Sequence, residues 1–261
     1  MNRTVIGFAC AGETMFGTLD MGLASGATGV LLVSGGNEIR SGAWGGQAAL
    51  AAALAREGMP VFRFDRRGVG DSSGANLGFR ASAPDIAAAL AAFRAAAPHV
   101  KRVFALGNCD AASALMLHAA LVPGLDGLIL TNPWTLDDDN QAAPVHSSAA
   151  LRRHYLRRLV DPRQWARLLA GKVALGKLAQ GLRTAASPQE SSALAQEMRA
   201  GLAAFTGPVT ILLAEGDRTA QLFRSHWGSD PRVIGHAGSS HSFADAPEWL
   251  LDQVVRAIRP G

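Results

Sequence analysis

The sequence predicts one α/β domain built on a mostly parallel, eight-stranded sheet with helices on both faces. Two observations predict it: short apolar runs alternate with alanine-rich helical runs along the 261 residues, and 48% of the residues are hydrophobic. Alternation of this kind is typical of βαβ units. A chain of this length and composition is sufficient to bury one large core.

Eight apolar runs have the length expected of strands. They are Thr4 to Phe8, Met15 to Leu19, Gly29 to Ser34, Val61 to Asp65, Arg102 to Leu106, Gly127 to Thr131, Val209 to Ala214 and Arg232 to Gly235. The first two follow each other with no room for a crossover helix. We therefore expect the sheet to start with an antiparallel pair.

Four helices are expected between these strands. They cover about Trp44 to Arg56, Pro84 to Ala97, Asp110 to Leu121 and Pro247 to Ile258. Gly58 and Pro60 in AREGMP end the first helix, and Pro98 in PHVKR ends the second, because neither residue type continues a helix well.

The alternation stops between Trp134 and about Phe205, where a polar linker, TLDDDNQAAP, precedes an arginine-rich helical pattern. An insertion between two strands explains this most simply. We therefore expect a core of residues 1–133 and 206–261, and a helical cap of residues 134–205 over the carboxyl edge of the sheet.

The predicted cap is basic, with nine basic residues and one acid between Leu151 and Arg183, whereas the rest of the chain is mildly acidic. Four arginines at its start are candidates for binding an anionic acyl substrate: Arg152, Arg153, Arg157 and Arg158. Such a substrate includes a CoA or carrier-protein thioester; peripheral contact with an anionic membrane and a merely solvated helix face are the alternatives.

Composition excludes several classes of protein. The uneven charge argues against a nucleic-acid-binding surface. Cys10 and Cys109 are too few for a disulfide framework, and no spacing of cysteine with histidine resembles a zinc site, so we expect no metal and no other cofactor.

No signal-peptide core and no apolar run of roughly 18 to 20 residues is present, which favours a cytoplasmic location. Oligomeric state has no signature in the sequence.

The stretch ALGNCDAAS, residues 105–113, is typical of a strand that turns sharply into a helix. Such a turn strains its central residue, here Cys109, and projects the side chain above the sheet, so its neighbours must be small, as Gly107 and Ala111 are. The positive end of the following helix would favour the thiolate, and the backbone N–H of Asp110 would stabilise an oxyanion. A buried, inert cysteine is the alternative.

A cysteine nucleophile needs a base and an orienting acid. His241, in the loop AGSSHSFAD before the last helix, is the expected base, with His236 as a nearby competitor. Asp217 follows the strand that ends at Ala214 and is the favoured acid. Glu215, and Asp137 to Asp139 after the preceding strand, remain alternatives.

The loop VSGGNEIRSG after the third strand is expected to supply a second oxyanion donor, the amide of Gly36 or Asn37, because glycines let the backbone approach a bound carbonyl. The glycine-rich segment FDRRGVGDSSG, residues 64–74, neither opens a helix nor follows the first strand. We interpret it as structural rather than dinucleotide-binding.

These segments together resemble the α/β-hydrolase superfamily across essentially the whole chain. More narrowly, residues 34–74, DIAAALAAFRAAAP and GNCDAASAL are similar to the first type of exosortase A system-associated hydrolase, bacterial proteins encoded beside exopolysaccharide genes. The resemblance implies the α/β-hydrolase fold, a cysteine nucleophile at Cys109, and a triad completed by Asp217 and His241. A pair of residues His-Gly before the oxyanion loop is common in this superfamily, whereas this chain has Ser34-Gly35.

The expected function is hydrolysis of an ester or thioester through an acyl-enzyme on Cys109. Two alternatives remain open from the sequence. The acyl group could pass to an alcohol or amine, which would make the protein an acyltransferase. The chain could also be a non-catalytic partner of an export or polysaccharide assembly that keeps the fold.

Overall fold

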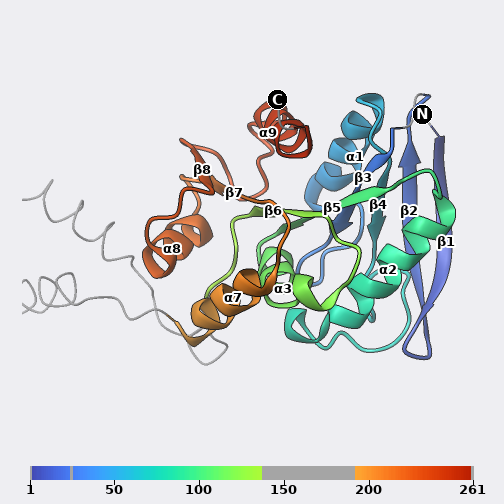
Figure 1. Cartoon of the computed structure of the whole chain (residues 1–261), viewed down its shortest axis with the longest axis horizontal. Helices are drawn as coiled ribbons and strands as arrows, with labels where there is room; N and C mark the ends of the chain where they lie inside the picture. Colours follow the sequence, from blue (N-terminus) through green and yellow to red (C-terminus); the bar gives the residue numbers. More distant parts are fainter. Residues whose placement is uncertain (1, 24–25, 137–191, 260–261) are drawn as a thin grey trace, which may run out of the picture.

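The computed structural model describes residues 2–23, 26–136 and 192–259. These residues form a twisted eight-stranded sheet with helices on both faces (Figure 1). The strands are β1 (Asn2–Cys10), β2 (Glu13–Met21), β3 (Thr28–Val33), β4 (Val61–Phe64), β5 (Arg102–Asn108), β6 (Gly127–Thr131), β7 (Val209–Ala214) and β8 (Val233–His236). The predicted fold class is confirmed, and β6 and β7 have the predicted bounds.

The strand order across the sheet is β1-β2-β4-β3-β5-β6-β7-β8. The β1–β2 and β2–β4 pairs are antiparallel, and every other neighbouring pair is parallel. Ala11 and Gly12 join β1 to β2 with φ angles of 50° and 85°. Two successive positive φ values are what a two-residue hairpin turn requires, so the predicted antiparallel start is present.

Six α-helices are described: α1 (Gly46–Arg56), α2 (Ala83–Ala96), α3 (Asp110–His118), α7 (Ala193–Ala204), α8 (Arg218–Trp227) and α9 (Pro247–Ile258). Short 3-10 helices precede α1 at Ala43–Gly45 and α2 at Phe79–Ala81, and Ala119–Leu121 extends α3. Helices α1, α2 and α9 match their predicted bounds within two residues, and α3 with the 3-10 helix after it covers the predicted Asp110 to Leu121. Helix α8 was not predicted.

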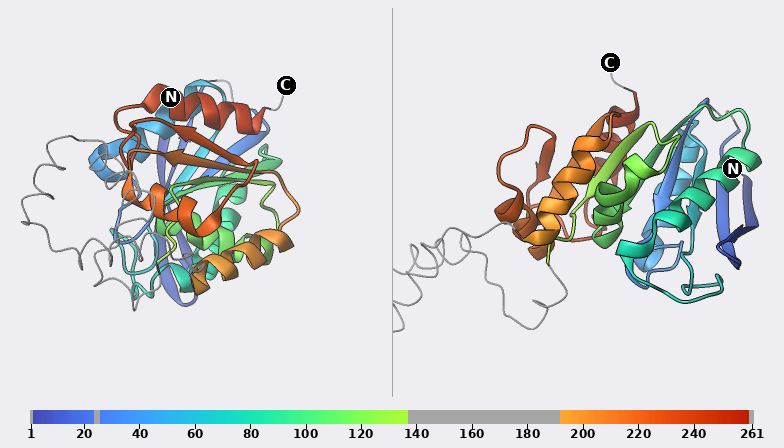
Figure 2. Two further views of the ribbon diagram at one scale, coloured as in Figure 1. Left: turned by 90° about the vertical axis from the view of Figure 1, so that its left-hand side faces the viewer. Right: turned by 60° about the horizontal axis from the view of Figure 1, so that its bottom comes forward.

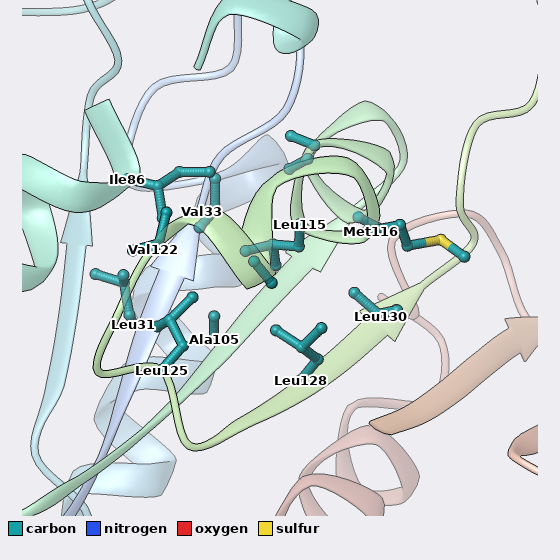
Figure 3. Close-up of a cluster of buried hydrophobic side chains, with 14 of the residues drawn as sticks. Leu31, Val33, Ile86, Ala105, Leu115, Met116, Val122, Leu125, Leu128 and Leu130 are labelled. Atoms are coloured by element: carbon teal, nitrogen blue, oxygen red, sulfur yellow. The ribbon is translucent and has the colours of Figure 1, made fainter. Parts of the chain in front are cut away.

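Two hydrophobic cores lie on opposite faces of the sheet. Figure 2 shows the helices that cover these faces. Along β3, Leu31 and Val33 pack with α2 and α3, whereas Val30 and Leu32 pack with α1 and α9. Figure 3 shows the first core, in which side chains of β3, β5 and β6 lie against Leu115 of α3. A strand buried on both faces has a continuous apolar sequence, and this is why the sequence predicts these strands.

Helix α7 falls within the predicted cap, residues 134–205, but it packs against α3 in the core. Leu194, Met198 and Leu202 of α7 are buried in the same cluster as α3. The rest of the predicted cap, residues 137–191, lies outside the described residues, so the division into core and cap stays a prediction. Thr135 and Ser192 flank that segment, and a 2.6 Å hydrogen bond from Ser192 Oγ to the Thr135 carbonyl joins them.

The parallel strands β3, β5, β6, β7 and β8 end at the same edge of the sheet, because parallel neighbours share one direction. The loops that follow them therefore meet, and they carry the residues that the sequence singled out. Within the described ranges, the helices are too short or too polar to cross a bilayer.

The contact between α7 and α3 predicts a stability difference between two Gly→Ala substitutions. A Cβ on Gly201 would lie 2.2 Å from the Met116 carbonyl oxygen, whereas a Cβ on the helical Gly46 meets nothing within 4 Å. Gly201→Ala should lower the free energy of unfolding by about 1–3 kcal/mol, and Gly46→Ala should raise it by up to about 1 kcal/mol. Urea titration measures both, and equal midpoints would contradict the packing of α7.

Candidate active site

Cys109 occupies a sharp turn between β5 and α3, with φ 58° and ψ −124°. Positive φ is unusual for a residue that is not glycine, and holding it costs about 1–3 kcal/mol. A Cβ on Gly107 would lie 2.8 Å from the Ala111 carbonyl carbon, so the strand and helix approach this closely only because position 107 is glycine. The local sequence thus gives the strained turn that was expected.

Hydrogen bonds hold the Cys109 backbone in this conformation. Its N–H donates to the Thr131 carbonyl at 3.0 Å, and its carbonyl accepts from the amides of Ser113 at 3.2 Å and Trp134 at 3.3 Å. The side chain is partly exposed, whereas Cys10 is buried near Asp85. Burial and then the Asp85 carboxylate raise the pKa of Cys10. The two thiols therefore stand in different surroundings, and only that of Cys109 faces a cavity.

His241 lies between Asp217 and Cys109. Its Nδ1 is 3.0 Å from Asp217 Oδ2, and its ring lines the same cavity as Cys109, near enough for that side chain to affect the pKa of the imidazole. Because Nδ1 faces the carboxylate, Nε2 is left for the thiol. Glu215, the rival acid, pairs instead with Arg224 at 3.1 Å, and Asp137 to Asp139 lie outside the described residues.

Asp217 caps the N-terminus of α8, and hydrogen bonds at this position fix the orientation of its carboxylate. Oδ2 accepts the Ala220 N–H at 3.1 Å as well as the His241 hydrogen bond. Burial pulls the pKa of Asp217 upward, but the hydrogen bonds from His241 and the helix amides outweigh it, so the pKa lies below its ordinary value. The carboxylate is thus ionised and oriented before any substrate arrives.

The pKa of His241 is raised to about 10. The hydrogen bond to Asp217 is the largest cause and the hydrogen bond to Cys109 the second, while burial opposes both. An imidazole with this pKa is protonated at neutral pH, which favours a negatively charged partner on its other side.

Asn132 holds the histidine loop in place, and sequence reasoning missed it. It is fully buried at φ 44°. Its Nδ2 donates to the His241 carbonyl at 2.8 Å, and its Oδ1 accepts the Ala214 N–H, also at 2.8 Å. Asn132 therefore links the ends of β6 and β7 to the loop of His241. A polar residue directly after a buried parallel strand was the signal that could have identified it.

A cavity of about 630 Å³ lies over these residues. Cys109 and His241 line it, and so do the polar or aromatic groups Asn37, Glu38, Arg66, Asn76, Phe79, Asn108 and Trp134. The predicted oxyanion residues Asp110, Gly36 and Asn37 all line it. The Gly36 N–H, however, donates to the Asp110 carboxylate at 2.7 Å and 2.8 Å, so it is engaged in this conformation.

Among the remaining predicted residues that the structure describes, His236 does not line this cavity. It hydrogen-bonds Ser239 and packs its ring against Trp249, with 4.7 Å between centroids. The glycine-rich segment after β4 is bound to the fold through the buried Asp65, whose carboxylate accepts the Arg40 N–H at 2.5 Å, but Arg66 of the same segment lines the cavity. The four cap arginines, Arg152, Arg153, Arg157 and Arg158, lie outside the described residues.

Replacing Asn132 should lower the pKa of His241. Asn132→Gly tolerates the positive φ but removes all three side-chain hydrogen bonds, to Asn108, His241 and Ala214, so the histidine loop loses its anchor to β6. The pKa should fall from about 10 by roughly one unit or more, which corresponds to ~1.4 kcal/mol of lost interaction. NMR titration of labelled imidazoles measures it, with His226 and His236 as internal controls. An unchanged His241 titration would rule out the positioning role.

The chain matches the model of the alpha/beta hydrolase family over residues 30–253. Comparison with curated protein sequences gives no match. Solved structures with the same fold include the esterase Pf2001 of Pyrococcus furiosus (14% identity, TM-score 0.63, covering 98% of this chain and 91% of that one). They also include the alpha/beta hydrolase GrgF from Penicillium sp. sh18 (16% identity, TM-score 0.64, covering 98% of both).

A third similar structure is an alpha-beta serine hydrolase homologue from Coxiella burnetii (15% identity, TM-score 0.63, covering 99% of both chains). At such identities the structural likeness shows the fold, whereas the family match spans most of the sequence. This protein therefore belongs to the alpha/beta hydrolase family.

Proposed function

We propose that this protein cleaves an ester or thioester through a covalent acyl intermediate on Cys109. One observation carries the proposal: a partly exposed thiol at a strained turn lines the same cavity as His241, whose Nδ1 lies 3.0 Å from Asp217 Oδ2. Acyl transfer needs a nucleophile, a base and an orienting carboxylate in that order. Membership of the alpha/beta hydrolase family and the fold shared with an esterase support it.

In the resting enzyme, the ring of His241 is protonated at neutral pH, because its pKa is raised to about 10. Its positive charge lies beside the Cys109 side chain, and the N-terminus of α3 adds positive potential near the sulfur. Negative charge that develops on the sulfur is therefore stabilised by both groups.

Acylation begins when the thiolate attacks the substrate carbonyl carbon. The Sγ–C bond forms while the carbonyl π pair moves onto oxygen, and the Asp110 N–H at the start of α3 stabilises that oxyanion. The carbonyl then re-forms and expels the alkoxide or thiolate leaving group, which takes the proton from His241. An acyl thioester on Cys109 and a neutral imidazole result.

Deacylation uses the same histidine. Once Cys109 is a neutral thioester, its contribution to the raised pKa of His241 is gone, so this pKa falls and the imidazole is more often in the neutral form, which can accept a proton from water. The resulting hydroxide attacks the thioester carbonyl, and collapse of that intermediate breaks the C–S bond. The thiolate returns, paired with the imidazolium, and a carboxylic acid leaves.

The acyl group remains a separate proposal that rests on the sequence. The basic segment from Leu151 to Arg183 favours an anionic donor such as a CoA or carrier-protein thioester. The resemblance to exosortase A system-associated hydrolases favours a substrate from bacterial exopolysaccharide export.

Removing the thiol should abolish turnover. Cys109→Ala should lower kcat/KM for p-nitrophenyl acetate by about 10³-fold or more, because no group remains to carry the acyl intermediate. Cys109→Ser should retain part of the activity, since a hydroxyl fits the same turn. Cys10→Ala is the matched control and should behave as the native protein. Intact-mass analysis should find the acyl group on Cys109, and full activity in Cys109→Ala would sink the proposal.

The pH profile of Cys109 alkylation tests the pairing with His241. The native protein should react with iodoacetamide much faster than His241→Ala near pH 7, because the imidazolium stabilises the thiolate there. The difference should narrow as pH rises through about 10, where His241 loses its proton. His236→Ala should keep the native profile. Identical profiles for native protein and His241→Ala would remove His241 from the pair.

A further inference from the structure

Asp110 is the first residue of α3, and its carboxylate contacts the loop after β3. That loop is expected to supply the second oxyanion donor. Both of its oxygens accept the Gly36 N–H, at 2.7 Å and 2.8 Å. The next residue, Asn37, lines the cavity, and within the described part of the chain no acceptor contacts its amide. The two candidate amides therefore differ: one is engaged and the other is free.

The contact between Asp110 and the loop depends on a glycine. A Cβ on Gly35 would lie 2.4 Å from Asp110 Oδ1 and 3.0 Å from the Asn108 carbonyl oxygen, so any larger residue would displace the carboxylate first. The φ angle of Gly35 is not positive, so backbone conformation does not require a glycine here. This glycine provides space chiefly for the Asp110 carboxylate and, to a smaller extent, for the Asn108 carbonyl.

Arg66 holds the other side of the same loop. The guanidinium is buried, its Nη2 donates to the Gly36 carbonyl at 2.6 Å, and the same nitrogen is 3.6 Å from Asp110 Oδ2. Asn76 Nδ2 also approaches the Gly36 carbonyl, at 3.4 Å. The Gly36 N–H and C=O are therefore both fixed by side chains from distant parts of the sequence.

The position of the Gly36 carbonyl determines where the Asn37 amide points. These two groups belong to one trans peptide unit, in which N–H and C=O point in opposite directions. With the carbonyl held toward Arg66, the Asn37 N–H points away from it. A negatively charged oxyanion at the Gly36 N–H would instead compete with the Asp110 carboxylate for the same proton.

We infer that Asp110 and Arg66 are positioning residues that make the Asn37 N–H, and not the Gly36 N–H, the second oxyanion donor. The inference rests on the proposed acyl transfer at Cys109 and adds a role to the Asp110 side chain, separate from its backbone N–H. Two reactions of the same thiol test it. Acylation by p-nitrophenyl acetate passes through an oxyanion, whereas iodoacetamide forms the Sγ–C bond and releases iodide without one.

Asp110→Ala should slow acylation of Cys109 by about 10²-fold or more, without slowing its alkylation. Asp110→Asn keeps an oxygen that accepts the Gly36 N–H and should restore most of the acylation rate. Both rates come from intact-mass time courses, and circular dichroism verifies folding. Faster acylation in Asp110→Ala would mean that the carboxylate blocks the Gly36 donor, and an equal fall in both rates would mean a merely structural role. Either result overturns the inference.

Gly35→Ala tests the same contact from the other side. Its methyl group should displace the carboxylate and reproduce the loss of acylation with alkylation preserved. The double variant with Asp110→Ala should be no worse than the slower single variant, because both changes remove one contact; additive losses would contradict the inference. Gly46→Ala is the control for the substitution itself. If native protein is alkylated but never acylated at Cys109, the proposed function fails as well, which separates the two failures.

Discussion

The backbone conformation at Cys109 is the constraint on which the rest of the site depends. A residue with a Cβ at φ 58° is strained, so it persists only where its surroundings hold it. Gly107 leaves room for α3 to start at once, and the Thr131 carbonyl binds the Cys109 amide across to β6. These contacts fix the thiol, the helix N-terminus and the loop after β6 as one unit, to which a substrate carbonyl must adapt.

Charge near the thiol is organised in two pairs. Asp217 and His241 supply a proton donor and acceptor on one side of Cys109. Arg66 lies 3.6 Å from the Asp110 carboxylate and offsets its negative charge, and both residues line the same cavity as Cys109. Because the two pairs stand on different segments, the proposed mechanism assigns proton transfer and oxyanion stabilisation to separate parts of the fold. Asn132 joins the first pair to β6 and has no contact with the second.

Most of the fold followed from the sequence, because strands buried on both faces leave apolar runs that turn residues interrupt. Helix α8 is not predicted because it begins with polar residues and lacks the alanine-rich pattern of the other helices. Helix α7 was assigned to the insertion, since periodicity shows that a helix has an apolar face but not which core that face covers. The tertiary structure shows which core α7 covers, because Gly201 of α7 approaches α3 closely.

For the site, the sequence by itself determined what local geometry requires: a small-residue turn around Cys109 and a loop able to present His241. It left open which acid meets the imidazole and whether the Gly36 or Asn37 amide is free. Those choices depend on partners far apart in the chain, since the Asp110 carboxylate reaches a loop 74 residues away. Tertiary structure decided them because a hydrogen bond is set by distance and direction in space, which sequence spacing does not encode.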